Sequence, residues 1–316
     1  MDPLLKQKIV QVLAKHPNVR FAILLCLGKA QESLTDVTLR KAAKDEALRC
    51  NLSDLVAVDR LLRREHPDLV VNAAAYTAVD QAESDGHSAV LINTALPSFI
   101  GTVMSEWNGA VIHYSTDYVF DGTARRPYNE DDGTAPLGVY GRSKLAGERA
   151  LAKVGADYLV LRTAWVYSLH GRNFLTTMLR LGAERKQLTV VDDQHGTPTS
   201  AGFVATATAQ VAKKWMKETQ SRRKKSGIYH LTAAGETTWH GFANAIFDEA
   251  VASGRLQEAP TVLPIDTAGY PTPAERPAWS VLDTSRISTS FRVKPPDWRS
   301  DLRIMMSGGY ESSSST

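Results

Sequence analysis

The chain has 316 residues, 43% hydrophobic and 22% charged, so it can bury a sizeable core as one large domain or two. Its 37 basic and 34 acidic residues give a net charge of +3, too even a balance to indicate nucleic-acid binding or an anionic membrane surface. The two cysteines form no CxxC pair and the eight histidines show no ligand spacing, which predicts a reduced, cytoplasmic protein without a metal site.

Short apolar runs alternate with longer helical patterns in the first half of the chain. The apolar runs predict strands at 21–27, 68–74, 110–115 and 158–163, and the other patterns predict helices near 53–65, 81–106 and 140–153. Even the run at 21–27 is far shorter than the ~20 residues that span a bilayer. Because continuous apolar strands suit a parallel sheet covered on both faces, we expect a doubly wound, Rossmann-like α/β domain over residues 1–165.

Proline and glycine become denser after about residue 166. The pattern predicts a smaller substrate-binding domain over residues 166–306, with helices near 173–185, 200–217, 239–253 and 297–306. A strand at 227–232 is a candidate to return to the main sheet, and the low-complexity ending predicts a disordered tail at 307–316. The basic run at 213–225 fits a solvated helix end and loop, with a polyanion-binding patch as the alternative.

A tyrosine and a lysine stand four residues apart at the start of the predicted helix 140–153. On a helix, Tyr140 and Lys144 share one face about 5–6 Å apart, and an ammonium there lowers the pKa of the phenol. Lowering that pKa from ~10 to ~7 needs about 4 kcal/mol, which only a site that excludes water supplies. The spacing alone fits equally a surface tyrosine lying along a lysine stem.

The ends of the predicted strands supply context for this pair. Ser115, Thr116 and Asp117 end the run at 110–115, and three alanines end the run at 68–74. Parallel sheets bind ligands beyond the carboxyl ends of their strands. We therefore expect hydroxyl and carboxyl groups, together with a surface open to a flat ligand, to meet at that edge.

Several stretches of the chain then form a recognisable set. They include "VVNAAAYTAVDQAE", "VIHYSTDYVFDG", "APLGVYGRSKLAGE", "LRTAWVYS" and "YPTPAERPAWSVLDTSRI", and they run from about residue 51 to about residue 304. The set resembles the extended short-chain dehydrogenase/reductases and, within that family, the dTDP-4-dehydrorhamnose reductases. The resemblance implies NADPH- or NADH-dependent reduction of the C4 ketone of dTDP-4-dehydro-6-deoxy-L-mannose, a nucleotide sugar, to dTDP-L-rhamnose.

The resemblance also implies roles for individual residues. Tyr140 would protonate the C4 oxygen, Lys144 would hold the nicotinamide ribose and lower the Tyr140 pKa, and Thr116 would complete a hydrogen-bonded triad. Thr116 and Asp117 would contact the sugar, and Trp165 would wall its pocket. Besides Tyr140 and Lys144, the residues expected to bind the cofactor are Gly28, Lys29, Asn51, Leu52, Ala75, Tyr76 and Thr77. A homodimer is common among proteins of this kind.

One residue separates a reductase from the related nucleotide-sugar 4,6-dehydratases. Dehydratases that this chain resembles carry Thr-Asp-Glu at the strand end, where the two carboxyl groups serve as acid and base. This chain has Tyr118 at the third position, so the base for elimination is missing. The resemblance therefore favours a reductase.

Residues 1–50 depart from the family pattern. The first βα turn should read Gly-x-x-Gly-x-x-Gly, so that the backbone closes on the pyrophosphate, but Gln31 and Leu34 replace the second and third glycines and Glu32 adds negative charge. Three interpretations stay open: an altered loop that binds cofactor, a diverged loop with weak or lost binding, or an aberrant reading of the gene. With binding lost, the alternative function is a non-catalytic nucleotide-sugar-binding or regulatory protein of the same fold.

Overall fold

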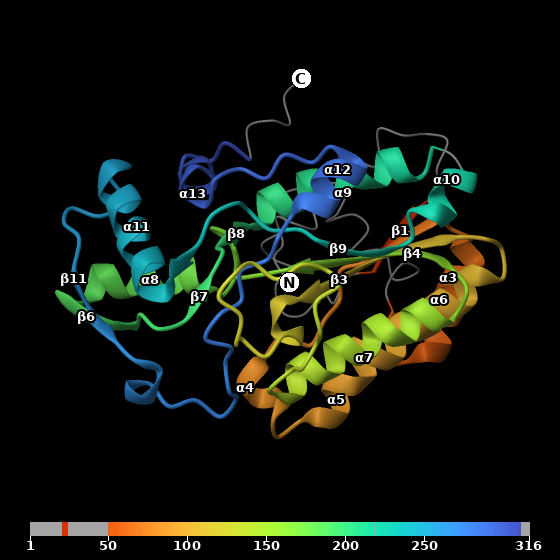
Figure 1. Cartoon of the computed structure of the whole chain (residues 1–316), viewed down its shortest axis with the longest axis horizontal. Helices are drawn as coiled ribbons and strands as arrows, with labels where there is room; N and C mark the ends of the chain where they lie inside the picture. Colours follow the sequence, from red (N-terminus) through yellow and green to blue (C-terminus); the bar gives the residue numbers. More distant parts are fainter. Residues whose placement is uncertain (1–20, 25–49, 218, 311–316) are drawn as a thin grey trace.

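A five-stranded parallel sheet lies at the centre of the computed structural model, which describes residues 21–24, 50–217 and 219–310 (Figure 1). The strand order is β1-β2-β3-β4-β9. The strands are β1 (Phe21–Leu24), β2 (Leu69–Asn72), β3 (Ala110–Thr116), β4 (Asp157–Thr163) and β9 (Gly227–His230). Helices lie on both faces of the sheet, so the predicted doubly wound α/β architecture is confirmed.

Successive strand residues point to opposite faces of the sheet, and a separate apolar cluster fills each side. Val71, Ile112 and Leu161 face one helical layer, whereas Val70, Val111 and Val160 face the other. The first layer contains α9 (Ala201–Trp215) and α12 (Ser285–Phe291), and the second contains α3 (Leu55–Glu65), α6 (Leu96–Ser105) and α7 (Val139–Lys153). Burial on both faces explains why these strands are continuous apolar runs.

A short helix, α4 (Val79–Ala82), precedes a long one that runs from Gly86 to Ser105 and includes a π-helical turn. Its parts are α5 (Gly86–Val90), η3 (Leu91–Ala95) and α6. By length and composition, with a mean hydropathy of 1.3, it is the one helix among the described residues that could cross a membrane. In this fold it packs against β3, α3 and α7, as a core helix does.

The second half of the chain builds its own apolar cluster beside the sheet. Leu175, Phe242, Ile246 and Trp298 meet there, with α8 (Phe174–Glu184), α11 (Trp239–Ala252) and α13 (Trp298–Met306) around them. Three two-stranded pairings complete this half: β6 (Gln187–Val191) with β11 (Thr261–Ile265), β5 (Val166–Tyr167) with β8 (Thr199–Ser200), and β7 (His195–Gly196) with β10 (Thr237–Thr238). The remaining strand of this half, β9, lies beside β4 in the main sheet.

The division near residue 165 is less clean than the sequence indicates. The helix α9 follows that point in the chain but covers the main sheet, because the parallel strand β9 needs a helical crossover before it. The later helix α12 packs on the same face. The basic run ends in α10 (Thr219–Lys224), where Arg222 is buried in an ion pair with Asp157, 2.6 Å from Nε to Oδ2.

Residues 307–310, which the sequence predicts to belong to a disordered tail, are part of the described structure. Tyr310 packs against Gly202, and its hydroxyl donates a hydrogen bond to Asp301 Oδ1 over 2.6 Å. The Tyr310 ring fills the space beside Gly202 of α9 and so anchors residues 307–310 on the second half of the chain. The remaining residues, 311–316, lie outside the described part of the chain.

The contact between α7 and the π-turn leaves no room for a side chain. A Cβ atom at Gly147 would lie 2.0 Å from the Asn93 carbonyl oxygen. We expect Gly147→Ala to lower the free energy of unfolding by about 1–3 kcal/mol, since the two helices must separate. Urea denaturation measures this, with Gly133→Ala as control, because a Cβ at exposed Gly133 meets nothing within 4 Å. Equal midpoints for the two variants would contradict the close-contact argument.

Candidate active site

The first turn of α7 is held against the end of β3. Glu83 Oε1 accepts a hydrogen bond from the Val139 N–H over 2.7 Å, which satisfies one of the free donors at the helix start. A Cβ at Gly141 would lie 2.2 Å from the Tyr118 carbonyl oxygen, so this glycine allows the helix to approach η4 (Asp117–Val119). The result is that Tyr140 lies beside the residues that follow β3.

Tyr140 is half-buried, and its ring meets the Tyr118 ring edge-on at a centroid distance of 5.7 Å. Burial raises the pKa of Tyr140 to about 12, although a side-chain hydrogen bond with Thr116 works in the opposite direction. The sequence-based expectation of a lowered Tyr140 pKa is therefore wrong for this structure. The reason is that the Lys144 ammonium is directed elsewhere.

Lys144 is 1% exposed and points toward β3. Its Nζ donates a hydrogen bond to the Tyr114 carbonyl oxygen over 2.5 Å and lies 3.4 Å from His113 Nε2. Burial lowers the pKa of Lys144 to about 8, against an opposing effect of the Glu148 carboxylate. Tyr140 and Lys144 thus share a helix, but Lys144 hydrogen-bonds to the sheet.

Thr116 and Asp117 form a buried polar pair at the carboxyl end of β3. The Thr116 hydroxyl donates to Asp117 Oδ1 over 2.9 Å and accepts from the Tyr118 N–H over 3.2 Å. Among the described residues, the buried Asp117 Oδ2 has no hydrogen bond of normal geometry. Burial raises the pKa of Asp117 to about 6, outweighing the lowering by Ser280 and Thr116. This free oxygen is suited to accept a hydrogen bond from a ligand hydroxyl.

The loop after β2 is tied to α7 by a buried amide that the sequence analysis did not single out. Asn93 Oδ1 accepts from the Tyr76 N–H over 2.9 Å, and Asn93 Nδ2 donates to the Tyr76 carbonyl over 3.1 Å and to the Ser143 hydroxyl over 3.0 Å. The loop also contains Ala75 and the exposed Thr77. A lone asparagine inside an apolar helix was the available signal, because a buried amide needs several partners.

A second group missed by the sequence analysis fixes α7 to β4. The Glu148 carboxylate accepts from Arg162 Nε over 3.0 Å and from Arg162 Nη2 over 2.7 Å, and it also accepts from the Ser115 hydroxyl. Both ion-pair partners are about 2% exposed or less. This pair holds the helix that carries Tyr140 and Lys144 in a fixed register on the sheet.

Trp165 lies just beyond β4, at the same edge of the sheet. Its ring stacks on Trp239 at a centroid distance of 3.5 Å and an interplanar angle of 5°, and its backbone has a φ of 47°, in the left-handed region. A Cβ at Gly196 would lie 2.3 Å from the Trp165 ring, so only glycine fits there. Trp239, which begins α11, is therefore a further residue at this edge.

Two of the residues expected to bind the cofactor lie directly before α3. Exposed Asn51 accepts hydrogen bonds from the Ser53 N–H and hydroxyl in the turn before α3, and Leu52 packs in the apolar cluster with Val58 and Leu62. Gly28 and Lys29 lie outside the described residues, as does the rest of the first βα turn. Within the described ranges, no group of three His, Cys, Asp or Glu side chains could hold a metal ion.

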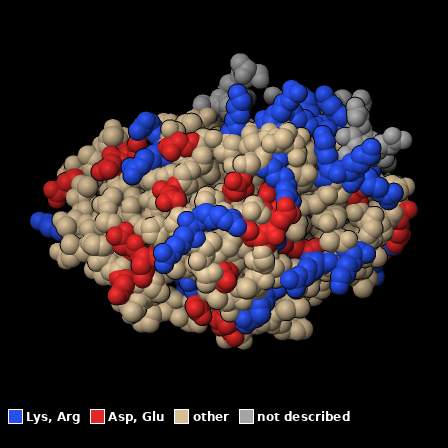
Figure 2. Space-filling model, viewed as in Figure 1, with Lys and Arg blue, Asp and Glu red and all other residues tan. Residues whose placement is uncertain are grey.

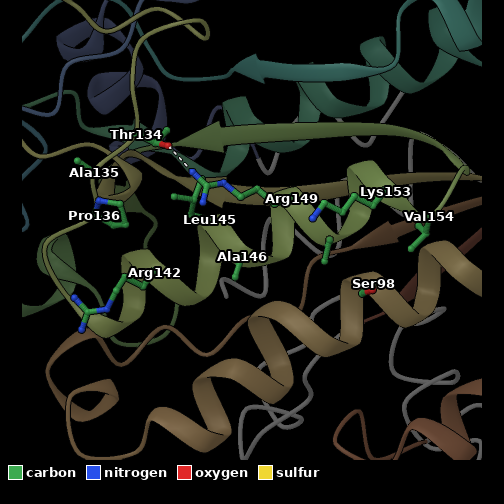
Figure 3. Close-up of a pocket in the computed structure, with 11 residues that line it drawn as sticks. Ser98, Thr134, Ala135, Pro136, Arg142, Leu145, Ala146, Arg149, Lys153 and Val154 are labelled. Atoms are coloured by element: carbon green, nitrogen blue, oxygen red, sulfur yellow. Dashed lines mark hydrogen bonds between the residues drawn. The ribbon is translucent and has the colours of Figure 1, made fainter.

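A pocket of about 790 Å³ opens on the side of α7 that faces away from the sheet (Figure 3). Arg142, Arg149 and Lys153 line it, and Arg149 reaches across to the Thr134 hydroxyl over 3.3 Å. Space-filling Figure 2 shows Lys and Arg side chains in a line across the lower right of this face. Because Lys144 points to the opposite side of the helix, the pocket is separate from the candidate active site.

The described residues fit the nicotinamide half of a dinucleotide and a polar substrate. Buried Ala73 and Ala74 follow β2 and leave its end without bulky side chains. The Thr163 hydroxyl, at the end of β4, is a second buried polar atom without a partner among the described residues. Free polar atoms beside a tyrosine at a parallel sheet edge suit acid-assisted chemistry on a hydroxylated ligand.

Comparison with known proteins gives consistent relatives. Residues 24–310 match the family described as RmlD substrate binding domain. The dTDP-4-dehydrorhamnose reductase of Burkholderia thailandensis is 46% identical over 81% of this chain and 86% of its own length, and that of Escherichia coli K12 is 43% identical over 81% and 84%. A Bacillus anthracis dTDP-4-dehydrorhamnose reductase solved with NADP is 30% identical, with a TM-score of 0.72 over 81% of this chain and 85% of that one.

The raised pKa of Asp117 predicts a specific pH dependence of stability. Well below pH 3.8 the carboxyl group is neutral in both the folded and the unfolded chain. Between pH 3.8 and about 6 the unfolded chain loses this proton while the folded protein keeps it, so stability falls over this range and is constant above it. A folded pKa about two above the ordinary 3.8 corresponds to a loss of about 3 kcal/mol. We expect Asp117→Asn to lack this decline in urea denaturation between pH 4 and 7. The exposed Asp248→Asn is the control and should follow the parent protein.

Proposed function

Because the chain belongs to the RmlD substrate binding domain family, with dTDP-4-dehydrorhamnose reductases as its relatives, we propose that it catalyses the same reaction. The reaction is the NAD(P)H-dependent reduction of the C4 ketone of dTDP-4-dehydro-6-deoxy-L-mannose to dTDP-L-rhamnose. The observation that carries the proposal is the meeting of Tyr140, Thr116 and Asp117 at the carboxyl end of β3. That edge is where parallel α/β sheets bind their ligands.

The protein's part in the reaction is to supply a proton and to orient the sugar. The cofactor, when bound, supplies the hydride. Tyr140 stays protonated at neutral pH because burial keeps its pKa high, so its hydroxyl can donate a proton to the ketone oxygen. Thr116 hydrogen-bonds to the phenol and to Asp117, and the free oxygen of Asp117 accepts from a sugar hydroxyl. Trp165 and Trp239 present an apolar wall to the ring.

We propose NADPH as the hydride donor, with NADH as the alternative. The 30%-identical Bacillus anthracis reductase was solved in complex with NADP. Ala75, Tyr76 and Thr77 would line the dinucleotide, and Lys144 would hold the nicotinamide ribose. Both ligands are small molecules, and the scarcity of cysteine fits a cytoplasmic location. A homodimer stays a prediction of the sequence.

Removing the Tyr140 hydroxyl tests the proposed acid. We expect Tyr140→Phe to lower kcat by about 10²–10⁴-fold, because the proton donor is lost, with little change in KM for the nucleotide sugar. Steady-state kinetics at pH 7 measure both constants. The matched control is Tyr158→Phe, since Tyr158 lies near the opposite end of a sheet strand, where β4 begins. Unchanged turnover in Tyr140→Phe would remove this residue from the mechanism.

A titration of the protein with NADPH separates the reductase from the non-catalytic alternative. The alternative, a nucleotide-sugar-binding or regulatory protein, rests on Gln31 and Leu34 in place of two loop glycines. We expect saturable binding, followed by fluorescence, and retained binding in Tyr140→Phe. Absence of binding at millimolar concentrations of both NADPH and NADH, with nucleotide-sugar binding intact, would favour the alternative and exclude a reductase.

A further inference from the structure

The pocket on the outer face of α7 is lined by three positive side chains, Arg142, Arg149 and Lys153 (Figure 3). Among the described residues, none of the three forms an ion pair with a carboxylate, and no acidic residue lines the pocket. Arginines elsewhere on the surface are neutralised by carboxylates; these pairs are Arg63 with Glu106, Arg126 with Asp132, Arg180 with Glu184 and Arg303 with Glu249. The pocket therefore concentrates positive charge that the rest of the described chain leaves uncompensated.

The spacing of the three cations places them on one face of α7. At 3.6 residues per turn, positions 142, 149 and 153 point to the same side of the helix, whereas Lys144 points to the opposite side, toward β3. Arg149 and Lys153 are one turn apart, with Cβ atoms about 5–6 Å from each other. Arg142 lies two turns before Arg149, so the row of positive charge is about 16 Å long.

This placement of charge is unfavourable for α7 on its own. Arg142 lies in the first turn of the helix, where the helix dipole repels a positive charge, and that turn contains no acidic residue. Arg149 and Lys153 are like charges four residues apart, which repel each other. A bound anion replaces both repulsions by attraction, so the row of cations is suited to an anionic ligand.

The floor of the pocket between these charges is apolar. Leu145, Ala146 and Ala150 of α7 form it, and Pro136 lines it from the loop before α7. Arg149 Nη2 donates to the Thr134 hydroxyl over 3.3 Å, which is long for a hydrogen bond, so a stronger acceptor can replace this hydroxyl. The pocket thus offers an apolar surface beside charged groups that are free to bind a ligand.

The size of the pocket limits the ligand further. Its volume of about 790 Å³ is that of a small-molecule site, and a single phosphate ion would leave most of the apolar floor uncovered. Guanidinium groups bind phosphate through paired hydrogen bonds and also stack on flat rings. Cations beside an apolar floor of this size suit a nucleotide, which joins phosphate groups to a flat base.

A second copy of the chain fits this surface less well. In a two-fold symmetric contact the same patch lies on both subunits. Two copies of α7 that met through this face would bring one row of cations against the other, without an acidic residue in the lining to separate them. The charge pattern therefore favours a small anionic ligand over self-association.

We propose that the pocket on α7 is a nucleotide-binding site separate from the candidate active site. Arg149 and Lys153 hold the phosphate groups, and Arg142 and Pro136 contact the base. The inference does not depend on the proposed reduction, because none of these residues belongs to the groups assigned to proton transfer or to ligand binding at the sheet edge. The ligand contacts α7 from the side opposite Lys144.

Calorimetric titration of the full chain with thymidine diphosphate (dTDP) tests the site. We expect the double variant Arg149→Glu, Lys153→Glu to bind dTDP at this site about 10²-fold more weakly, because two charge-assisted hydrogen bonds are replaced by repulsion. The control is the double variant Arg60→Glu, Lys213→Glu, which makes the same charge change at exposed positions of α3 and α9 and should bind as the parent does. Equal urea midpoints without ligand show that both variants are folded.

The titration also separates this site from the proposed function. If the sheet edge binds dTDP as well, the parent has two sites per chain and the pocket variant keeps one. If the proposed function is wrong, the parent has the pocket site alone and the variant has none. Unchanged stoichiometry and affinity in the folded pocket variant would refute the pocket site in either case.

Fragments of the nucleotide test the ligand class. At the pocket we expect dTDP to bind about tenfold or more tightly than inorganic pyrophosphate or thymidine, because only dTDP uses both the cations and the apolar floor. Pyrophosphate that binds there as tightly as dTDP would overturn the nucleotide assignment. Dimerisation of the unliganded parent in size-exclusion chromatography, abolished in the pocket variant, would assign this face to a second copy and likewise overturn it.

A crystal structure of the protein grown with dTDP locates the ligand directly. We expect the diphosphate between the Arg149 and Lys153 side chains and the base against Pro136. A nucleotide found at the sheet edge alone, with the pocket on α7 empty at millimolar dTDP, would refute the proposal.

Discussion

The buried ion pair between Glu148 and Arg162 is the constraint on which the site depends. An unpaired charge inside a protein is strongly destabilising, so α7 can sit on the sheet only where these two groups meet. Ser115 adds a hydroxyl to the same carboxylate, and Ser115 and Arg162 are register neighbours on β3 and β4. The pair therefore sets the height of α7 along the strands, and that height determines which strand residues Tyr140 and Lys144 reach.

The face of the sheet under α7 changes character along the strands. Val70 and Val111 near the start contact apolar helix residues, whereas Asn72 and His113, two positions further along, are polar. Side chains two positions apart on a strand point to the same face, so residues paired in register on neighbouring strands form successive layers on that face. Apolar packing stabilises the start of the strands, and hydrogen-bonded polar groups gather toward their carboxyl ends. Charged groups in that layer are removed from water, which is why the pKa values of Lys144 and Asp117 are displaced.

The fold followed from sequence because the strands of the main sheet are largely apolar on both faces and several helices begin at a polar capping residue, such as Asp54 for α3. The resemblance also predicted roles for Tyr140 and Thr116, which the structure places close together. In the sequence, Asn93 and His113 are each marked only as a single polar residue inside an apolar run, and their hydrogen-bond partners, distant in the chain, could not be predicted. The direction of the Tyr140 pKa shift could not be predicted either, because the spacing of two residues on a helix does not show where a flexible lysine side chain points.

The left-handed backbone at Trp165 has a consequence for motion. A tryptophan backbone is strained at a φ of 47°, and the stacking of the Trp165 ring on Trp239 offsets this strain. The indole that maintains this backbone shape comes from α11, in the second half of the chain. If α11 swung outward, Trp165 would lose that support and tend to relax, carrying the segment after β4 with it. The backbone shape after β4 is in this way supported by a residue from the second half of the chain.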